Sequence, residues 1–168
     1  KFSLERFISA HSIMISFEGV PAIYFNSLFG TSNDKAKYII TGNNRDLNRY
    51  RWNHKNITEK LKNKKSKQSI FYKSITDLLE VRRKQKAFHP NGLRSCINMG
   101  PKIFCFKRQS VDKKQIIICI TNLSSKTQRK KINYKFLKWK NLLDFKSNHI
   151  LDKMIKLKPF QTVWLSNV

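Results

Sequence analysis

The side chains best suited to bind a ligand follow directly after a short apolar run. Residues 20–25 (VPAIYF) are mostly β-branched or aromatic and form a continuous run, as in a parallel strand buried on both faces. The polar and turn-forming residues that follow are Asn26, Ser27, Gly30, Thr31, Ser32 and Asn33. Because α/β enzymes keep their ligands in loops at the carboxyl ends of parallel strands, the sequence predicts a ligand-binding loop here.

No catalytic constellation is visible in the residue types alone. The sequence has no Gly-rich phosphate loop and no Ser-His-Asp set at informative spacing. Five acids stand in settings typical of solvated charges, on helix faces, at a helix end or in a turn: Glu5, Glu18, Asp77, Glu80 and Asp112. We therefore expect none of these carboxylates to act as a general acid or base.

The cysteines and histidines indicate a reduced protein without metal. The cysteines are odd in number, widely spaced and set in apolar, strand-like segments: Cys96, Cys105 and Cys119. This setting predicts buried, reduced thiols and a cytoplasmic location. The histidines are scattered without ligand spacing: His11, His54, His89 and His149. With no C-x-x-C pair either, we expect no metal and no other cofactor.

The chain is strongly basic, with a formal net charge of +25 from 35 Lys and Arg against 10 Asp and Glu. Such an excess ordinarily indicates nucleic acid or an anionic membrane. However, the lysines are dispersed among many Asn and Ile, all with A/T-rich codons, and the densest cluster, residues 60–67, has no aromatic side chain for base stacking. No apolar run is long enough to span a bilayer. We expect neither nucleic acid nor a membrane as partner.

Helices are expected on both sides of the apolar run. Helical spacing of apolar residues predicts one helix over residues 2–17 and another over residues 69–85. Gly19 ends the first, and the His-Pro-Asn-Gly sequence at residues 89–92 stops the second. Residues 26–67 show no sustained period and are rich in turn formers, so they are expected to form a long loop.

After Gly92 the sequence changes to short β-type runs joined by polar turns. The expected strands are residues 94–98, 103–108, 115–122, 130–134, 141–143, 154–157 and 162–165. Residues 116–120 (IIICI) predict a central buried strand, and alternation in residues 131–134 predicts an edge strand. Several short strands with polar turns predict a small antiparallel β-sandwich.

Segments along nearly the whole chain resemble one enzyme family, in that family's order. Residues 19–25 (GVPAIYF) followed by SLFG look like the eighth barrel strand of the α-amylase superfamily, glycoside hydrolase family 13. Residues 43–49 (NNRDLNR) are similar to the Arg-Asx-x-Asn-Arg element of its sucrose-phosphorylase branch. Residues 82–83 (RR) with 87–92 (AFHPNG) resemble the end of that branch's last barrel helix, and residues 157–165 (LKPFQTVWL) the closing strand of the β domain.

The resemblance implies a fold in two domains. Residues 1–90 would form the last helix-strand-helix of a TIM-type (β/α)8 barrel, that is, an α/β barrel fragment. Residues 91–168 would form a small antiparallel β-sandwich domain. The chain does not begin with Met, and helical spacing is present from Phe2. We therefore expect the carboxyl-terminal part of a longer enzyme.

The resemblance also implies a retaining α-glucosyl-transferring enzyme. In this family an Asp nucleophile forms a glycosyl-enzyme and a Glu serves as acid and then base. These carboxylates lie at the ends of earlier barrel strands, so they would precede Lys1, and this chain alone is expected to be inactive. The implied function is sucrose-phosphorylase-like, with glucosyl transfer from sucrose or a related glucoside to inorganic phosphate.

The resemblance places four residues of this chain at the substrate: Asn26, Arg45, Asn48 and Arg49. Their loop would fold over the acceptor side of the pocket. A guanidinium group is planar, always charged and a bidentate donor, which suits a phosphate dianion, so Arg45 is the strongest candidate. The alternative is that Arg45 and Arg49 only pair with Asp46 or lie in water.

Two other functions remain open on the sequence alone. One is a hydrolase of the same superfamily, glucosidase-like or amylase-like, in which water replaces phosphate as acceptor. The other is a basic nucleic-acid-binding module, supported by the net charge of +25 alone. Binding that falls steeply with salt would identify the latter.

Overall fold

The computed structural model describes residues 1–132, 139–144 and 154–168. Contacts between residues group the chain into two compact units, one formed by Lys1–Pro21 with Asp77–Val168 and the other by Ala22–Thr76. The first helix belongs to the same unit as the strands because it contacts two of them, β3 and β7. These two units are divided at other places than residue 90. The expected domain boundary there stays a prediction.

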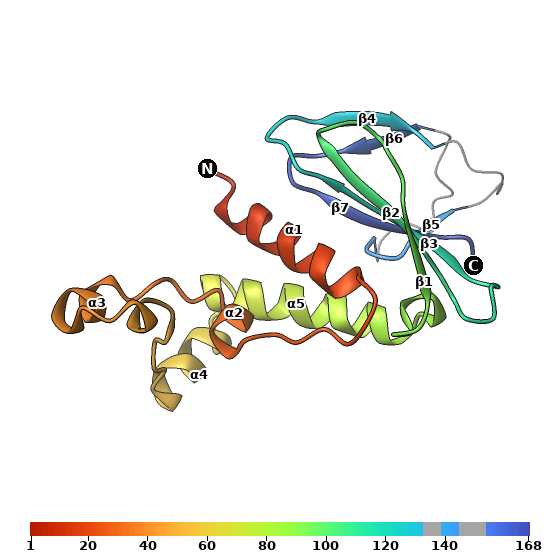
Figure 1. The fold of residues 1–168 in the computed structure, drawn as a ribbon. Helices are drawn as coiled ribbons and strands as arrows, with labels where there is room; N and C mark the ends of the chain where they lie inside the picture. The colour runs from red at the N-terminus through yellow and green to blue at the C-terminus, as the bar shows by residue number, and fades with distance from the viewer. Residues whose placement is uncertain (133–138, 145–153) are drawn as a thin grey trace. The chain divides into compact units, whose positions relative to one another are not determined.

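The larger unit contains two antiparallel sheets, seen edge-on in Figure 1. One sheet has the strand order β1-β2-β3-β7-β5, and the other pairs β4 with β6. The strands are β1 (Leu93–Cys96), β2 (Ile103–Gln109), β3 (Ile116–Asn122), β4 (Gln128–Lys131), β5 (Lys140–Asn141), β6 (Met154–Leu157) and β7 (Thr162–Ser166). Each overlaps an expected strand, although β4 shares only Lys130 and Lys131 with its expected range and β5 only Asn141, and the small antiparallel β-sandwich is confirmed. Asn133 and Tyr134 of the expected edge strand lie outside the described residues.

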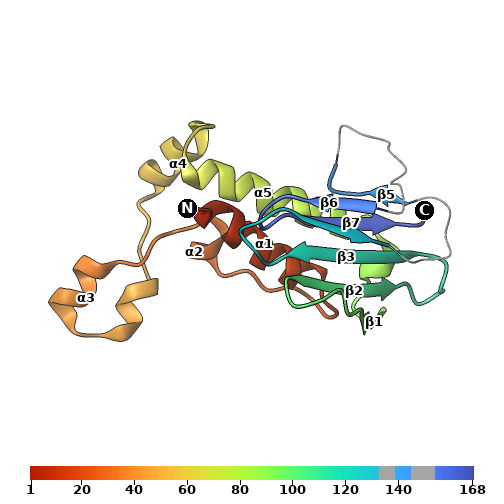
Figure 2. The same ribbon diagram turned by 90° about the horizontal axis from the view of Figure 1, so that it is seen from above.

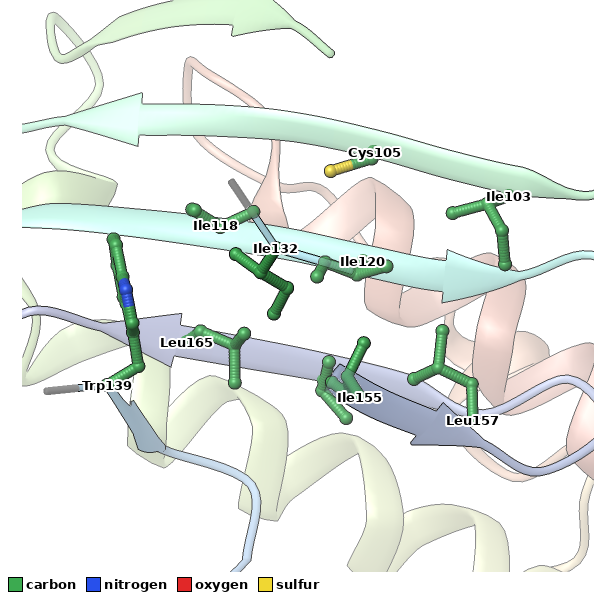
Figure 3. Close-up of a cluster of buried hydrophobic side chains, with 10 residues drawn as sticks. Ile103, Cys105, Ile118, Ile120, Ile132, Trp139, Ile155, Leu157 and Leu165 are labelled. Carbon is green, nitrogen blue, oxygen red and sulfur yellow. The ribbon is translucent and has the colours of Figure 1, made fainter. Parts of the chain in front are cut away.

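A hydrophobic core fills the space between the two sheets. Side chains alternate between the two faces of a strand, and β3, the central strand, sends Ile118 and Ile120 toward the small sheet. Ile155 and Leu157 of β6 meet them from the other side (Figure 3). The remaining buried members of this cluster are Ile103, Cys105, Ile132, Trp139, Val163 and Leu165.

The opposite face of the large sheet packs against helical segments. Here Phe106, Cys119 and Trp164 stand side by side on β2, β3 and β7, whose antiparallel course is visible in Figure 2. Helix α1 (Ser3–Ser16) contacts β3 and β7, and the 3₁₀ turn η2 (Lys86–Phe88) contacts β2. The ring of Phe88 meets that of Trp164 edge-on, with centroids 4.8 Å apart.

Two buried guanidinium groups close the carboxyl end of α1. Arg82 comes from helix α5 (Lys67–Arg83) and Arg108 from β2, and both lie over the ring of Phe88. Their acceptors are backbone carbonyl oxygens: for Arg82 those of Ile15, Phe17 (3.0 Å) and Gly19 (2.7 Å), and for Arg108 those of Ser16 (3.2 Å), His89 (2.8 Å) and Gly92 (3.4 Å). Carbonyls at a helix end lack intrahelical partners and carry partial negative charge. The two cations therefore replace a basic residue that the last turn of α1 itself lacks.

Residues 20–25 do not form the expected strand. The segment has no helix or strand assignment before Phe25, and Val20 is 82% exposed and Phe25 56% exposed. A strand needs a neighbour for its backbone donors and acceptors, and the described residues supply no strand that bonds to this one. The expectation of a buried strand is therefore wrong for this chain by itself, and the TIM-type barrel stays a prediction.

The expectation of one long loop over residues 26–67 is wrong as well. The smaller unit contains α2 (Phe25–Leu28), α3 (Lys35–Thr41), the 3₁₀ helix η1 (Asn44–Asn48) and α4 (His54–Lys62). Each is too short to give a sustained hydrophobic period. Local caps start three of them instead, because the side chains of Asp34, Asn43 and Asn53 accept from the backbone of α3, η1 and α4.

The cysteines agree with the sequence in two of three cases. Cys105 and Cys119 are buried and free, and burial raises the pKa of Cys105 to about 12. Cys96 is also free but exposed, because it lies on β1 at the edge of the large sheet. In the part of the chain that the structure describes, none of the helices is both long and apolar enough to cross a membrane.

Candidate functional site

Asn26 is a buried side chain that binds the polypeptide itself. It lies in α2, is only 7% exposed, and its amide nitrogen donates to the carbonyl oxygens of Asn48 (3.2 Å) and Tyr50 (3.0 Å). The hydroxyl group of Tyr24 donates to the same Asn48 oxygen at 3.2 Å. The side-chain oxygen of Asn26 is buried without a hydrogen-bond partner among the described residues. Asn26 and Asn48, both expected at the substrate, are thus brought together through the Asn48 backbone.

A second contact holds the same segment two residues further on. The indole nitrogen of Trp52 donates to the hydroxyl group of Thr31 at 2.9 Å, and the backbone nitrogen of Thr31 donates to the carbonyl oxygen of Asn26 at 2.9 Å. The rings of Tyr50 and Trp52 meet edge-on, 4.9 Å apart. Residues 48–52 are therefore attached to residues 24–31 at every second position.

Between these anchors, α3 and η1 form a closed hairpin, the orange lobe of Figure 1. Its base is closed by the backbone nitrogen of Asp34, which donates to the carbonyl oxygen of Leu47 at 2.7 Å. At its turn Gly42 has φ 64°, a left-handed conformation that glycine adopts without strain. The side chain of Asn43 then accepts from the backbone nitrogen of Arg45 at 3.0 Å and starts η1. The loop expected at the substrate is thus an ordered element.

Asp46 is the acidic residue of this hairpin and is fully engaged within it. Its carboxylate accepts from the Lys37 ammonium group at 2.8 Å and from the Thr41 hydroxyl group at 2.8 Å. These two hydrogen bonds, followed by the charges of Lys37 and Arg49, lower the pKa of Asp46 below its ordinary value. The charge on Asp46 is therefore used to join η1 to α3.

Arg45 and Arg49 are exposed at η1 and directly after it. In the described ranges, no carboxylate or other acceptor bonds to either guanidinium group. Of the alternative, pairing of Arg45 with Asp46 does not describe this structure, because Asp46 bonds Lys37 instead. The other half of the alternative, guanidinium groups that lie in water, agrees with the exposure of Arg45 and Arg49, so their role at the substrate stays a prediction. What the arrangement can do chemically is bind an anion, since guanidinium groups donate two parallel hydrogen bonds to phosphate or carboxylate.

Three of the carboxylates set aside in the sequence lie in ion pairs, namely Glu18, Glu80 and Asp112. Glu18 accepts from Arg94 at 2.6 Å, and this hydrogen bond lowers the pKa of Glu18. Glu80 pairs with Lys84 on the surface of α5 at 3.1 Å. Within the described residues, no three His, Cys, Asp or Glu side chains gather as a metal site requires.

The sequence did not predict the contacts that hold the hairpin and its anchors, which are made by Tyr24, Thr31, Lys37 and Trp52. A partial signal existed, because Asp34 and Gly42 are a typical helix cap and helix stop on either side of the seven residues of α3. The pairing of Lys37 with Asp46 carries no such signal, since it joins two elements through a turn. Contacts of this kind follow no period in the sequence.

No protein-family model matches the chain. Among curated proteins, it is 31% identical over 161 residues to the glucosylglycerate phosphorylase of Escherichia coli (strain K12), which covers 95% of this chain and 28% of that protein. It is also 31% identical over 119 residues to the glucosylglycerate phosphorylase of Spirochaeta thermophila, which covers 71% of this chain and 20% of that protein. The chain thus spans less than a third of the length of these relatives.

Solved structures show the same fold. A variant of trehalulose synthase MutB in complex with Tris matches 98% of this chain and 39% of its own, with a TM-score of 0.72 and 12% identity. MutB from Pseudomonas mesoacidophila MX-45 matches 96% of this chain and 38% of its own, with a TM-score of 0.70 and 11% identity. At this identity the likeness concerns the fold alone.

Together, the fold and the sequence similarity relate the chain to glycoside hydrolase family 13, the α-amylase superfamily. Within that superfamily it is related to the sucrose-phosphorylase-like branch, and the curated relatives that it matches are glucosylglycerate phosphorylases.

Proposed function

We propose that this chain is part of a retaining enzyme that transfers an α-glucosyl group from a glucoside to inorganic phosphate. The observation that carries the proposal is the 31% identity to a glucosylglycerate phosphorylase over 95% of this chain. Because the curated relatives bear that name, we propose glucosylglycerate as the donor in preference to sucrose. Glucosylglycerate differs from sucrose in having an anionic leaving group.

In the proposed reaction, carboxylates outside this chain break the glycosidic bond. A nucleophile forms the glucosyl-enzyme while an acid protonates the leaving oxygen; that residue, now a base, then assists the acceptor. Arg45 would bind the phosphate that attacks the glucosyl-enzyme. Its exposed guanidinium group supports this role, because the one acid beside it in sequence, Asp46, is occupied by Lys37 and Thr41.

The proposal includes the two-domain arrangement expected from the sequence. Residues 1–90 would contribute α1, the extended segment 20–25 and α5 to a (β/α)8 barrel, and residues 91–168 would be the β domain. The high exposure of Val20, at 82%, supports a missing neighbour strand. We also propose a cytoplasmic location, supported by the buried free thiols of Cys105 and Cys119.

The test is a donor comparison with the whole enzyme. Phosphorolysis of glucosylglycerate and of sucrose is followed over a phosphate series by the release of glucosyl phosphate. We expect phosphate-dependent turnover, with a higher kcat/KM for glucosylglycerate. Glucose release without any dependence on phosphate would contradict the proposal and favour the hydrolase.

A further inference from the structure

The contacts of the Asn26 side chain fit a role in positioning the backbone better than direct substrate binding. One amide nitrogen holds the carbonyl oxygens of Asn48 and Tyr50, at 3.2 and 3.0 Å. An amide group has two donors on a short, planar side chain, so a single Asn reaches two carbonyls of an extended segment. A carboxylate of the same shape would face those oxygens with negative charge and no donor.

This contact lies where the hairpin ends. Asn48 is the last residue of η1, so the Asn26 bond lies three residues after Arg45. On the other side of Arg45, the turn at Gly42 and the Asn43 cap fix the start of η1. Arg45 is thus held from both ends, by the cap within the hairpin and by Asn26 outside it.

We infer that Asn26 is a positioning residue: its amide group fixes residues 48–50 and so sets the location of Arg45. This inference rests on the proposed function where it concerns phosphate. The contact with the backbone carbonyls, in contrast, can be tested without any substrate. Tyr24, which donates to the Asn48 oxygen at 3.2 Å, supports the same segment to a lesser extent.

Trypsin provides the substrate-free test, because Arg45, Arg49 and Arg51 are exposed cleavage sites in the segment concerned. Cleavage of folded protein tracks local opening when reclosing is fast. In the full chain, Asn26→Ala should accelerate cleavage after Arg49 and Arg51 on the order of tenfold, because both amide hydrogen bonds are lost. Cleavage sites are identified by mass spectrometry of the early fragments.

Three matched variants sharpen this test. Tyr24→Phe removes the hydroxyl group that donates to the Asn48 carbonyl oxygen and accepts from the Asn26 amide at 3.4 Å, but it leaves both Asn26 bonds to the backbone, so the increase should be only about threefold. Asn26→Asp should behave like Asn26→Ala or worse despite its shape, because it lacks the donors. Asn56→Ala, at an exposed amide in α4, should leave the rates unchanged. Unchanged cleavage in Asn26→Ala, or equal acceleration after Lys60 and Lys62 of α4, would overturn the inference.

A kinetic cycle in the whole enzyme tests whether Asn26 acts through Arg45. We expect Asn26→Ala to raise the KM for phosphate on the order of tenfold while hydrolysis of the glucosyl-enzyme is little changed. The double variant with Arg45→Ala should be no worse than Arg45→Ala alone, because residues that act as one unit are not additive. Fully additive losses would mean that Asn26 touches the substrate itself. Turnover that does not depend on phosphate, together with faster tryptic cleavage of Asn26→Ala after Arg49 and Arg51, would disprove the proposed function and leave the positioning role of Asn26 intact.

Discussion

At the scale of single residues, the contacts of Asp46 leave the guanidinium group of Arg45 available to a ligand. An Arg next to an Asp in sequence often forms an ion pair that would compete with a ligand. Here the carboxylate of Asp46 is engaged by Lys37 and Thr41, each at 2.8 Å. The guanidinium group of Arg45 is therefore exposed on an ordered turn, and binding an anion would not require a protein contact to break.

Replacing Arg45 tests its role at the acceptor. In the whole enzyme, Arg45→Ala should lower phosphate-dependent kcat/KM about tenfold to a hundredfold, because one charged hydrogen-bonding partner is worth about 1.5 to 3 kcal/mol. Arg45→Lys should recover little, since an ammonium group does not replace the planar fork. Steady-state phosphorolysis is compared with hydrolysis of the same donor. Equal losses in both reactions would mean that Arg45 does not serve the acceptor.

Buried Arg108 offers a test of stability without any ligand. It is fully buried and donates to three backbone carbonyls. Arg108→Met should lower the free energy of unfolding by about 3 kcal/mol or more, because buried carbonyls lose charged donors. Lys107→Met, a half-exposed neighbour on β2, is the control. Urea denaturation measures both, and similar values for the two variants would contradict this account.

The candidate site could be predicted only in part from its residues. The motif around Arg45 identified the segment, and the amide of Asn26 was expected at the same place. Its true partners, the carbonyls of Asn48 and Tyr50, are backbone atoms that every residue carries. Because they leave no trace in the residue types, the sequence could not show that Asn26 binds the chain.

At the scale of elements, predictability depended on whether the partner of an element lies within the described chain. The strands of the sandwich were predictable because β3 pairs with β2 on one side and with β7 on the other, and the apolar residues of all three are largely buried. Residues 20–25 have strand composition without a partner, so residues 20–24 form no helix or strand and stay partly or fully exposed. The short helices α3 and α4 depend on caps and tertiary contacts, which a periodic pattern does not report.

Two glycines in the smaller unit distinguish close packing from backbone strain. Gly30 has φ 55°, and a methyl group there would overlap the ring of Phe71. Gly30→Ala should lower the free energy of unfolding by about 3 kcal/mol or more, because the left-handed strain and the overlap add up. Gly42→Ala, with φ 64° and open space around it, should cost only about 1 to 2 kcal/mol. Thermal denaturation of both variants measures the difference, and equal losses would show that the contact with Phe71 is unimportant.

The hairpin of α3 and η1 should loosen in acid. Hydrogen bonds from Lys37 and Thr41 lower the pKa of Asp46 below its ordinary value of 3.8. A group whose folded pKa is depressed stabilises the fold above its unfolded pKa, and this contribution is lost as the pH falls through the folded value. Hydrogen exchange of the α3 amides, corrected for intrinsic rates, should therefore increase below about pH 4. Asp46→Asn should show the faster exchange already at neutral pH, and a wild-type-like pH profile in that variant would refute the assignment.

At the scale of the whole molecule, the net charge and the exposed apolar residues both bear on which partners the protein can bind. The +25 charge is dispersed over the chain, and the absence of a nucleic-acid partner stays a prediction. Exposed large apolar residues are spread along the chain, and two groups of them lie close together in sequence, Val20 with Tyr24 and Phe25, and Ile39 with Ile40 on α3. The first lies in the segment that the proposal assigns to a barrel strand.

This chain expressed by itself should self-associate and show no glucosyl transfer. An apolar segment with free backbone donors and acceptors is prone to pair with copies of itself. Size-exclusion chromatography at several concentrations, with phosphorolysis assayed on the same fractions, gives the measurement. Val20→Lys should reduce association, because charge on an edge opposes pairing. A monodisperse wild-type chain that turns over donor with phosphate would contradict both parts.

The guanidinium cap of α1 has a consequence for synthesis on the ribosome. The carbonyl oxygen of Ser16 accepts a hydrogen bond from Arg108, which is synthesised 92 residues later. At translation rates of about 5 to 20 residues per second, that delay is on the order of 5 to 20 s. Until Arg82 has been synthesised, the end of α1 has neither of its two guanidinium groups. A nascent chain stalled before β2 would still lack Arg108, and its helix α1 would be incompletely capped. The cap of α1 is thus completed only after β2, the strand that carries Arg108, has been made.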